Sequence, residues 1–217
     1  ILLGAAAGAI RTQQQSLEIK PLSMLFSPGM LPSISIVAPA YNEESTIVES
    51  VNSLLNLRYP DYEIIVVNDG SPDNTLRVLI ENLELERTDI FLHGYLNTQQ
   101  VRGIYRNPRL PELIVIDKQN GGKADSLNAG INASRKSYFA AIDSDSLLER
   151  DSLLRLASRF LDSDAPVVAS GGNIFPVNGC RVSRGKLDEI RLPRKLLGKY
   201  QTLKYVRSFM AGRTGWA

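Results

Sequence analysis

The sequence predicts an α/β protein with a doubly wound, mostly parallel sheet, and three observations support this fold class. From residue 33 onwards, short apolar runs alternate with segments of helical periodicity, as they do in chains of βα units. Runs such as residues 64–67 are apolar at every position, which is typical of strands buried on both faces. Each of the first four predicted strands ends in a polar cluster, and open α/β sheets bind ligands beyond the carboxyl ends of their strands.

The first third of the chain is predicted to contain two strands, each followed by a helix. Residues 34–38 form the first strand, and Ser45 is a favourable N-cap for the helix that follows. Residues 63–67 form the second strand, after which Asp73 or Asn74 caps a second helix. Both helices have apolar positions at helical spacing, which are Ile47, Val48, Val51, Leu54 and Leu55 in the first and Leu76, Leu79, Ile80 and Leu83 in the second.

The rest of the chain continues the alternation after an irregular segment. Residues 88–110 show no regular pattern, and prolines at 108 and 111 exclude a helix there. Further strands are predicted at 113–116, 138–142, 166–170 and 173–177, and helices at 123–133, 150–161 and 192–210. The last helix is basic and amphipathic. We favour an apolar stripe packed on the sheet, and the alternative is a helix that lies on anionic lipid.

Composition limits the kinds of chemistry that the chain can perform. Its 217 residues are enough for one α/β domain, and a net charge of +2 excludes no class of partner. With one cysteine, Cys180, no intrachain disulfide is possible, and a reducing compartment is expected. With one histidine, His93, neither a His–Asp dyad nor a multi-histidine metal site is expected. No basic patch interleaved with aromatic residues appears, so nucleic acid is not an expected partner.

The two ends of the sequence suggest a piece of a longer protein. Residues 1–10 are apolar and are followed by Arg11, but a membrane span needs about 20 apolar residues. We interpret residues 1–10 as the end of a truncated transmembrane helix, with a buried Ala-rich helix or a signal-peptide remnant as alternatives. Residues 11–32 form a polar linker, and residues 33–217 form a domain that continues beyond the chain. The protein is then expected to be membrane-anchored, with this domain on the cytoplasmic side.

Two of the polar clusters offer groups that suit a nucleoside. The first strand runs into Pro39 and Ala40, followed by the aromatic face of Tyr41 and by Asn42 and Glu43, which can bond ribose hydroxyls or a base edge. The second strand runs into a turn that contains Asp69, which could accept a hydrogen bond from the imino N–H of a pyrimidine. Ordinary turn and cap chemistry is the alternative for both clusters.

The other two clusters offer groups that suit a diphosphate. Gly121, Gly122 and Lys123 at the start of a helix combine backbone amides, the helix dipole and an ammonium group into a cradle for an anion. Asp143 and Asp145 follow the fourth strand, and residues two apart on an extended segment share a face. Two adjacent carboxylates repel each other unless a cation neutralises them. A hard divalent cation that carries a diphosphate fits this requirement.

As a set, these motifs resemble the family 2 glycosyltransferases of the GT-A fold. The resemblance is strongest to the processive, membrane-bound branch that includes hyaluronan, chitin, cellulose and poly-N-acetylglucosamine synthases, and it covers residues 33–217. The residues that carry it stand in the expected order and are 38–44, 66–71, 120–128 and 143–145, the last with the Asp-X-Asp pattern.

The resemblance implies a role for each matching residue. The uridine would be held by Pro39, Ala40, Tyr41, Asn42, Glu43 and Asp69. Gly122 and Lys123 would bind the nucleotide and its phosphates. Asp143 would contact the ribose or metal-bound water, and Asp145, together with Asp143, would ligate Mg²⁺ or Mn²⁺ as the catalytic carboxylates. Many relatives have aspartate at position 68, so Asn68 could change one contact with the base.

The implied activity is transfer of a sugar, with inversion, from a nucleoside-diphosphate sugar, most simply a UDP-sugar, to a polysaccharide or another hydroxyl acceptor. In the family the general base belongs to a Glu-Asp-type motif beyond the segment that corresponds to Gly215 and Trp216, so residues 1–217 alone are expected to bind nucleotide but to transfer little sugar. One alternative is a catalytically inactive nucleotide-binding subunit of a polysaccharide-assembly complex. Another is a sugar-nucleotidyltransferase, which would need a Gly-rich, Arg-containing loop after the first strand. An NAD-binding protein lacks support because no Gly-x-Gly-x-x-Gly pattern occurs.

Overall fold

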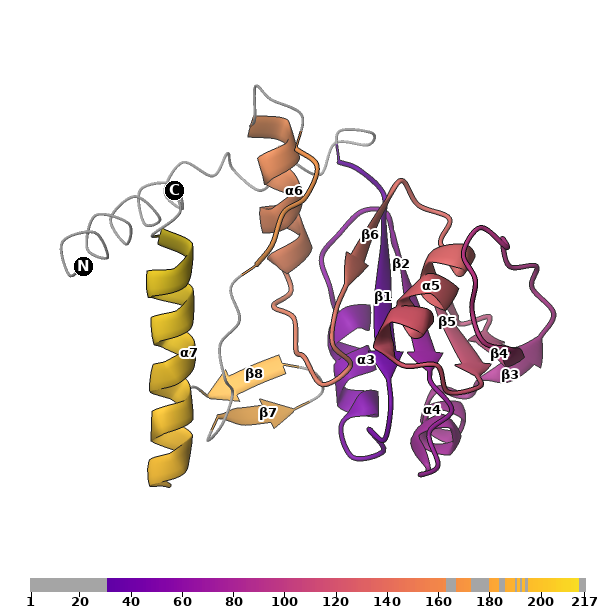
Figure 1. Cartoon of the computed structure of the whole chain (residues 1–217), viewed down its shortest axis with the longest axis horizontal. Coiled ribbons are helices and arrows are strands. Elements are labelled where there is room, and N and C mark those ends of the chain that lie inside the picture. Colours follow the sequence, from indigo (N-terminus) through magenta and orange to yellow (C-terminus); the bar gives the residue numbers. More distant parts are fainter. Residues whose placement is uncertain are drawn as a thin grey trace.

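The computed structural model describes residues 31–162, 167–172, 180–183, 186–189, 191, 193 and 195–214. Its main element is a six-stranded sheet in the order β3-β4-β5-β2-β1-β6 (Figure 1). Its four neighbouring strands β5 (Leu110–Lys118), β2 (Tyr62–Asn68), β1 (Ile34–Ala40) and β6 (Tyr138–Ala141) are parallel. Their carboxyl ends therefore meet at one edge of the sheet, as the sequence predicts.

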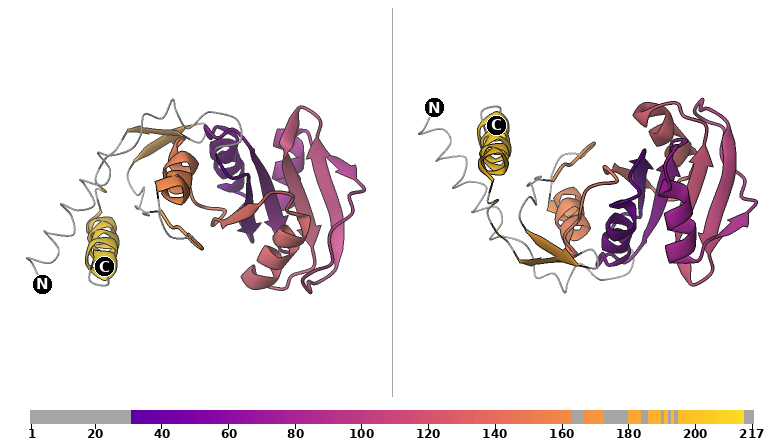
Figure 2. Two further views of the ribbon diagram at one scale, coloured as in Figure 1. Left: turned by 90° about the horizontal axis from the view of Figure 1, so that it is seen from above. Right: turned by 90° about the horizontal axis from the view of Figure 1, so that it is seen from below.

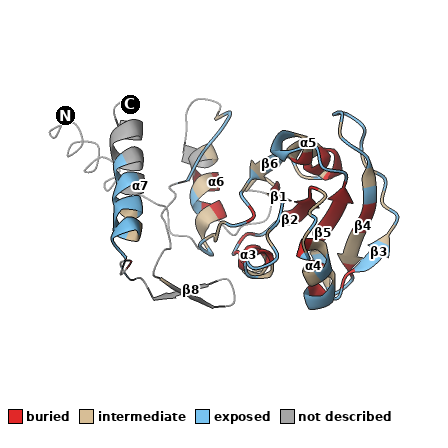
Figure 3. Cartoon of the chain, turned by 60° about the horizontal axis from the view of Figure 1, so that its bottom comes forward, coloured by how far each residue is buried: buried red, intermediate tan, exposed pale blue. Residues whose placement is uncertain are grey.

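Helices cover both faces of this sheet. The helices α3 (Ile47–Leu55), α4 (Thr75–Leu83) and α6 (Ser152–Asp162) pack with alternate residues of β1 and β2 into one hydrophobic core. The helix α5 (Lys123–Ala133) packs with the intervening residues into a second core on the other face (Figure 2). The central strands are buried on both faces (Figure 3). The doubly wound, mostly parallel prediction is confirmed by this arrangement.

The irregular segment at 88–110 contains a structure that the sequence did not reveal. The strands β3 (Glu86–Thr88) and β4 (Val101–Asn107) extend the sheet at one edge, and both of their pairings are antiparallel. The β4–β5 pairing has two register shifts, which interrupt the alternation of apolar and polar residues by which a strand is recognised. Pro108 lies in the turn between the two strands, where it needs no ladder hydrogen bond.

Helix capping follows the prediction in one helix and departs from it in the other. The Ser45 prediction is wrong: α3 begins at Ile47 after Thr46, whose hydroxyl donates to the Glu43 carboxylate at 2.7 Å. In α4, Asn74 stands at the N-cap position, but the capping side chain is that of Asp73, which accepts from the Thr75 N–H at 3.0 Å.

The C-terminal third is described only in part. The prediction of a strand at 166–170 is wrong for residues 167–170, which form no strand. The strand predicted at 173–177 lies outside the described residues. A short hairpin is formed by β7 (Arg181–Ser183) and β8 (Lys186–Glu189). The last helix, α7 (Leu196–Thr214), starts and ends four residues later than the predicted helix.

The apolar stripe of α7 does not pack on the sheet where it is described. Leu196, Tyr200 and Leu203 are 82%, 67% and 65% exposed. The packing interpretation of this helix is therefore wrong for these three residues. None of the described helices is both long and apolar enough to cross a membrane, and the predicted end of a transmembrane helix at residues 1–10 lies outside the described part.

Candidate active site

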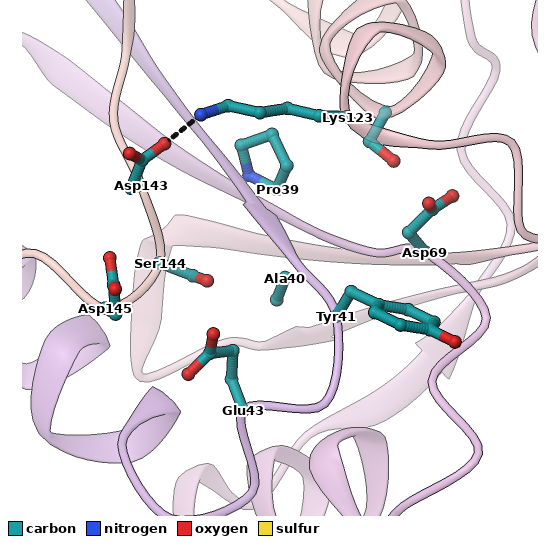
Figure 4. A pocket seen from close by; sticks show the side chains of 10 residues that line it. Pro39, Ala40, Tyr41, Glu43, Asp69, Lys123, Asp143, Ser144 and Asp145 are labelled. Atoms are coloured by element: carbon teal, nitrogen blue, oxygen red, sulfur yellow. Dashed lines mark hydrogen bonds and ion pairs between the residues drawn. The ribbon is translucent and has the colours of Figure 1, made fainter.

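A pocket of about 220 Å³ lies at the carboxyl ends of the parallel strands. Figure 4 places Asp143, Ser144 and Asp145 on one side of it, Asp69 and Tyr41 on the other, and the side chain of Lys123 reaching toward Asp143. Its lining consists of Pro39, Ala40, Tyr41, Glu43, Asp69, Lys123, Ser126, Asp143, Ser144 and Asp145. The structure thus brings together groups from four separate strand ends, including eight of the ten residues predicted to form the site.

The segment after β1 supplies an aromatic face and a carboxylate. Tyr41 is 49% exposed beside the pocket, and Glu43 lines it. Asn42 is not among the lining residues. It adopts a left-handed φ of 58°, which asparagine tolerates better than most residues, and its N–H donates to the Ser71 hydroxyl at 3.1 Å. Asn42 therefore links the loop after β1 to the loop after β2 through its backbone.

The Asp69 carboxylate is held firmly by the chain itself. It forms an ion pair with Lys118 and accepts hydrogen bonds from the N–H groups of Gly121 at 3.0 Å and Gly122 at 2.8 Å. Burial alone would raise the pKa of Asp69, but the ion pair with Lys118 and the hydrogen bonds from Gly121 and Gly122, with a smaller contribution from the nearby Ser126 hydroxyl, together lower this pKa below its usual value. Asp69 therefore stays ionised although its side chain is almost fully buried.

These contacts change the interpretation of the glycine pair as an anion cradle. Gly122 has a positive φ of 87° and directs its N–H at Asp69, so the anion that the two glycine amides bind in this structure is a side chain of the protein. Gly122 is also absent from the pocket lining. Lys123, the next residue, does line the pocket, and its ammonium forms an ion pair with Asp143. The positive charge that the cradle presents to the pocket is therefore Lys123.

The carboxylate pair lies in a turn. The strand β6 ends at Ala141, and the Ser146 N–H donates to the Asp143 carbonyl at 2.9 Å to close a turn around Ser144 and Asp145. The expected extended geometry is therefore wrong, although both carboxylates still reach the same pocket. Lys123 neutralises Asp143, whereas no hydrogen bond or ion pair from the described residues engages Asp145.

A divalent cation fits these carboxylates only in part. Among the described residues no three His, Cys, Asp or Glu side chains form a cluster that could hold a metal ion by themselves. Asp143 and Asp145 are exposed oxygen donors of the kind that Mg²⁺ and Mn²⁺ prefer. Mg²⁺ is commonly bound by one or two carboxylates together with substrate phosphates. The pocket therefore suits a metal ion that arrives with a phosphorylated ligand.

Several residues at or near the pocket were not predicted from the sequence. Ser126, on the first turn of α5, is fully buried and lines the pocket, and its hydroxyl has no hydrogen-bond partner of ordinary geometry, although it lies close enough to Asp69 to help lower that pKa. Ser144, between the two aspartates, is also buried there. Lys118 was missed because a lysine at the end of a strand gives no sign that it is buried. The position of Ser126, three residues after Lys123 on a helix, could have indicated a shared face.

The sequence suggested that Asn68 contacts the nucleobase, but the structure buries this residue next to the pocket. It is 2% exposed, and its amide donates to Asp117 at 2.7 Å and accepts from Ser71 at 2.6 Å. Asn68 does not line the pocket. Its side chain links β2 to β5, where a second carboxylate facing Asp117 would be repelled.

The structure thus combines a mostly parallel α/β sheet with a polar pocket of carboxylates and a lysine at the carboxyl edge of that sheet. The chain belongs to the glycosyl transferase family 2, whose family model matches residues 35–214. The family resemblance and the GT-A fold class expected from the sequence are confirmed by this match.

Poly-β-1,6-N-acetyl-D-glucosamine synthases are among the similar proteins. That of Staphylococcus aureus strain COL is 28% identical over 176 residues, which is 81% of this chain and 33% of the relative. That of Staphylococcus epidermidis is 27% identical over 175 residues, or 79% of this chain and 32% of the relative. The chain thus spans about one third of the length of the curated relatives that it matches.

Two solved structures are also similar to the chain. TarS residues 1–349 of S. aureus in complex with UDP-GlcNAc is 25% identical, with a TM-score of 0.43, over 60% of this chain and 31% of TarS 1–349. The mannosyltransferase PcManGT from Pyrobaculum calidifontis in complex with GDP-Man and Mn²⁺ is 21% identical, with a TM-score of 0.48, over 74% of this chain and 41% of that protein.

Proposed function

We propose that this chain is the nucleotide-sugar-binding part of an inverting glycosyltransferase, which transfers a sugar from a UDP-sugar to a growing polysaccharide. The observation that supports this proposal most is the composition of the pocket. At one end it has an ionised, fixed carboxylate beside an aromatic ring, Asp69 and Tyr41. At the other end it has a lysine and two carboxylates, Lys123, Asp143 and Asp145. These two ends match the base and the diphosphate of a nucleotide.

The base end has one acceptor position to offer. A carboxylate has about four lone-pair sites. Three of those of Asp69 are occupied by Lys118, Gly121 and Gly122. The remaining site suits a single donor such as the imino N–H of uracil, while the exposed face of Tyr41 can stack on the ring. Cytosine and adenine have no imino donor at that position, so this end of the pocket favours uridine over cytidine and adenosine.

The diphosphate end combines positive charge with carboxylate ligands. The glycine amides are occupied by Asp69, so Lys123 would meet the phosphates, and it would leave Asp143 to do so. Asp145 and the released Asp143 would hold Mg²⁺ or Mn²⁺ together with the phosphate oxygens. When bound, such an ion stabilises the negative charge that develops on the leaving diphosphate. Lys123, at the same end of the pocket, would contribute to the same stabilisation.

The donor and acceptor are inferred from the relatives. Those reported above are poly-β-1,6-N-acetyl-D-glucosamine synthases. We therefore propose an N-acetylhexosamine, in the form of UDP-N-acetylglucosamine, as the donor, and a carbohydrate hydroxyl as the acceptor. We further propose attachment to a membrane with the pocket on the cytoplasmic side, which the apolar run at 1–10 followed by Arg11 supports.

Calorimetry with the 217-residue chain against UDP, CDP, ADP and GDP, each with Mn²⁺, tests the proposal. We expect UDP to bind at least about tenfold more tightly than ADP or CDP, because one buried hydrogen bond to the base is worth about 1.4 kcal/mol. Asp69→Asn should remove most of this preference, whereas Asp61→Asn, which alters an ion pair at the opposite end of the sheet, should not. Equal affinity for all four nucleotides, or no binding of any, would contradict the proposal.

A further inference from the structure

The most unusual side chain outside the assigned site is Lys118, the last residue of β5. Its side chain is 0% exposed, and it is the largest of the fully buried side chains in the described residues. Lysine is rarely buried completely unless it is paired, because the loss of hydration of its charge is costly. A fully buried lysine at the edge of a ligand pocket therefore calls for a physical reason.

The Lys118 ammonium contacts three oxygen partners. It forms ion pairs with Asp69 and with Asp125 and donates to the Gln119 carbonyl at 2.8 Å. Two carboxylates share one buried cation, so the loss of the cation would leave Asp69 and Asp125 to repel each other. The geometry of both carboxylates thus depends on Lys118.

The two carboxylates belong to different elements. Asp69 follows β2, and Asp125 lies on the first turn of α5, where it also accepts from the Gln99 N–H at 2.9 Å. Lys118 itself ends β5. One buried ammonium therefore connects the ends of two strands with the start of the helix that carries Lys123 and Ser126 into the pocket.

We propose that Lys118 is a positioning residue that sets the base selectivity of the pocket. It holds the Asp69 carboxylate in one orientation, with Gly121 and Gly122 on the protein side and the remaining acceptor site available to a nucleobase. Without Lys118 the carboxylate can rotate or take up a proton, and its fixed acceptor is lost. The inference rests on the proposed uridine-nucleotide site and adds to it the residue that fixes the selective group.

A role in folding alone makes a different prediction from a positioning role. A variant that only destabilises the chain reduces the fraction of folded protein, and it weakens UDP and ADP binding by the same factor. Loss of positioning acts at the base, so it lowers the ratio of UDP affinity to ADP affinity while the shared diphosphate contacts are kept. The ratio, and not the UDP affinity itself, is therefore the diagnostic quantity.

The experiment measures this ratio by calorimetry with Mn²⁺ in the 217-residue chain and in Lys118→Met, which keeps the length of the side chain but removes its charge. We expect the UDP-to-ADP ratio to fall about tenfold, because truncation of one partner of a buried charge pair has effects of this size or larger. The control is Lys136→Met, which breaks the Lys136–Asp61 ion pair at the amino-terminal ends of the strands and should leave the ratio unchanged.

A second variant keeps the proposal testable if Lys118→Met fails to fold. Asp125→Asn retains the buried lysine but removes one of its two carboxylate partners, and we expect the ratio to fall about threefold, less than for the loss of the whole cation. An unchanged ratio in a folded Lys118→Met, or in Asp125→Asn where the first variant does not fold, would overturn the proposal. If the wild-type chain itself shows no preference for UDP, the proposed function fails first, and this result is separate from a failure of the positioning role.

Discussion

At the residue scale, several side chains near the pocket form matched pairs. Asn68 on β2 and Asp117 on β5 are both buried and joined by a 2.7 Å hydrogen bond, so the amide of one suits the carboxylate of the other. Lys118, the residue after Asp117 on β5, is likewise paired by charge with the carboxylates of Asp69 and Asp125. The identity of one residue in such a pair therefore fixes which residue types the other position tolerates.

Asn68→Asp should destabilise the fold because it places a second carboxylate against Asp117. An unsatisfied or repelled buried polar group costs about 1–3 kcal/mol, and we expect the free energy of unfolding in urea to fall by that amount. The double variant Asn68→Asp, Asp117→Asn restores an amide–carboxylate pair with the roles reversed, so it should recover most of the loss. A single variant as stable as the wild type would show that the pair is not formed.

At the element scale, the position of α5 determines the pocket because its first turn carries Lys123 and Ser126. The helix approaches β1 closely at Gly130, where a Cβ atom added to the glycine would lie 2.2 Å from a methyl group of Val37. The sheet beneath is held at the opposite side by α3, α4 and α6. The close approach at Gly130 therefore sets the height of α5 above the sheet.

Gly130→Ala should push α5 away from β1. Overpacking of a filled core costs about 1–3 kcal/mol, and we expect this loss in the free energy of unfolding, together with weaker UDP binding in the folded variant. Gly94→Ala is a matched control, because a Cβ at Gly94 meets nothing within 4 Å. If Gly130→Ala is as stable as Gly94→Ala, the helix does not depend on this contact.

At the scale of the whole molecule, the loops after β1, β2 and β5 are tied together by acidic side chains. Asp69 joins the β2 and β5 loops, and Asp73 accepts from the N–H groups of Glu44 and Thr75 to join the β1 and β2 loops. Burial alone would raise the pKa of Asp73, but the hydrogen bonds from Thr75 and Glu44 lower it below its usual value. The assembly of the pocket edge therefore depends on ionised carboxylates.

The stability of the chain should fall on acidification. The pKa values of Asp69 and Asp73 are lower in the folded than in the unfolded state, so the unfolded state binds more protons as the pH falls. Their contribution is present above the unfolded pKa, near 3.9 for aspartate, and is lost as the pH falls through the lower folded values. Asp73→Asn should be about 1 kcal/mol less stable than the wild type at pH 7, because hydrogen bonds to a charged acceptor are stronger than those to a neutral one by about that amount. Urea unfolding should show this gap narrowing toward low pH, and a constant gap would contradict the assignment.

The sequence predicts the parallel centre of the sheet because its strands are uniformly apolar and end in polar clusters. It does not reveal the β3–β4 extension, where register shifts disturb the alternation of residues such as Val101 and Tyr105. It predicts most of the pocket lining, since strand order alone brings the strand ends together. It cannot show that Gly121 and Gly122 bind Asp69 or that Lys118 is buried, because these are contacts between residues about 50 positions apart.

The central claim is that the carboxylate pair and the fixed aspartate form one site for a metal-bound uridine diphosphate. Calorimetry of UDP binding with and without Mn²⁺ tests it in the wild type, in Asp145→Ala and in Asp89→Ala, an exposed carboxylate outside the pocket lining. We expect Mn²⁺ to strengthen UDP binding at least about tenfold in the wild type and in Asp89→Ala, and to have little effect in Asp145→Ala. Undiminished strengthening by Mn²⁺ in Asp145→Ala would contradict the account.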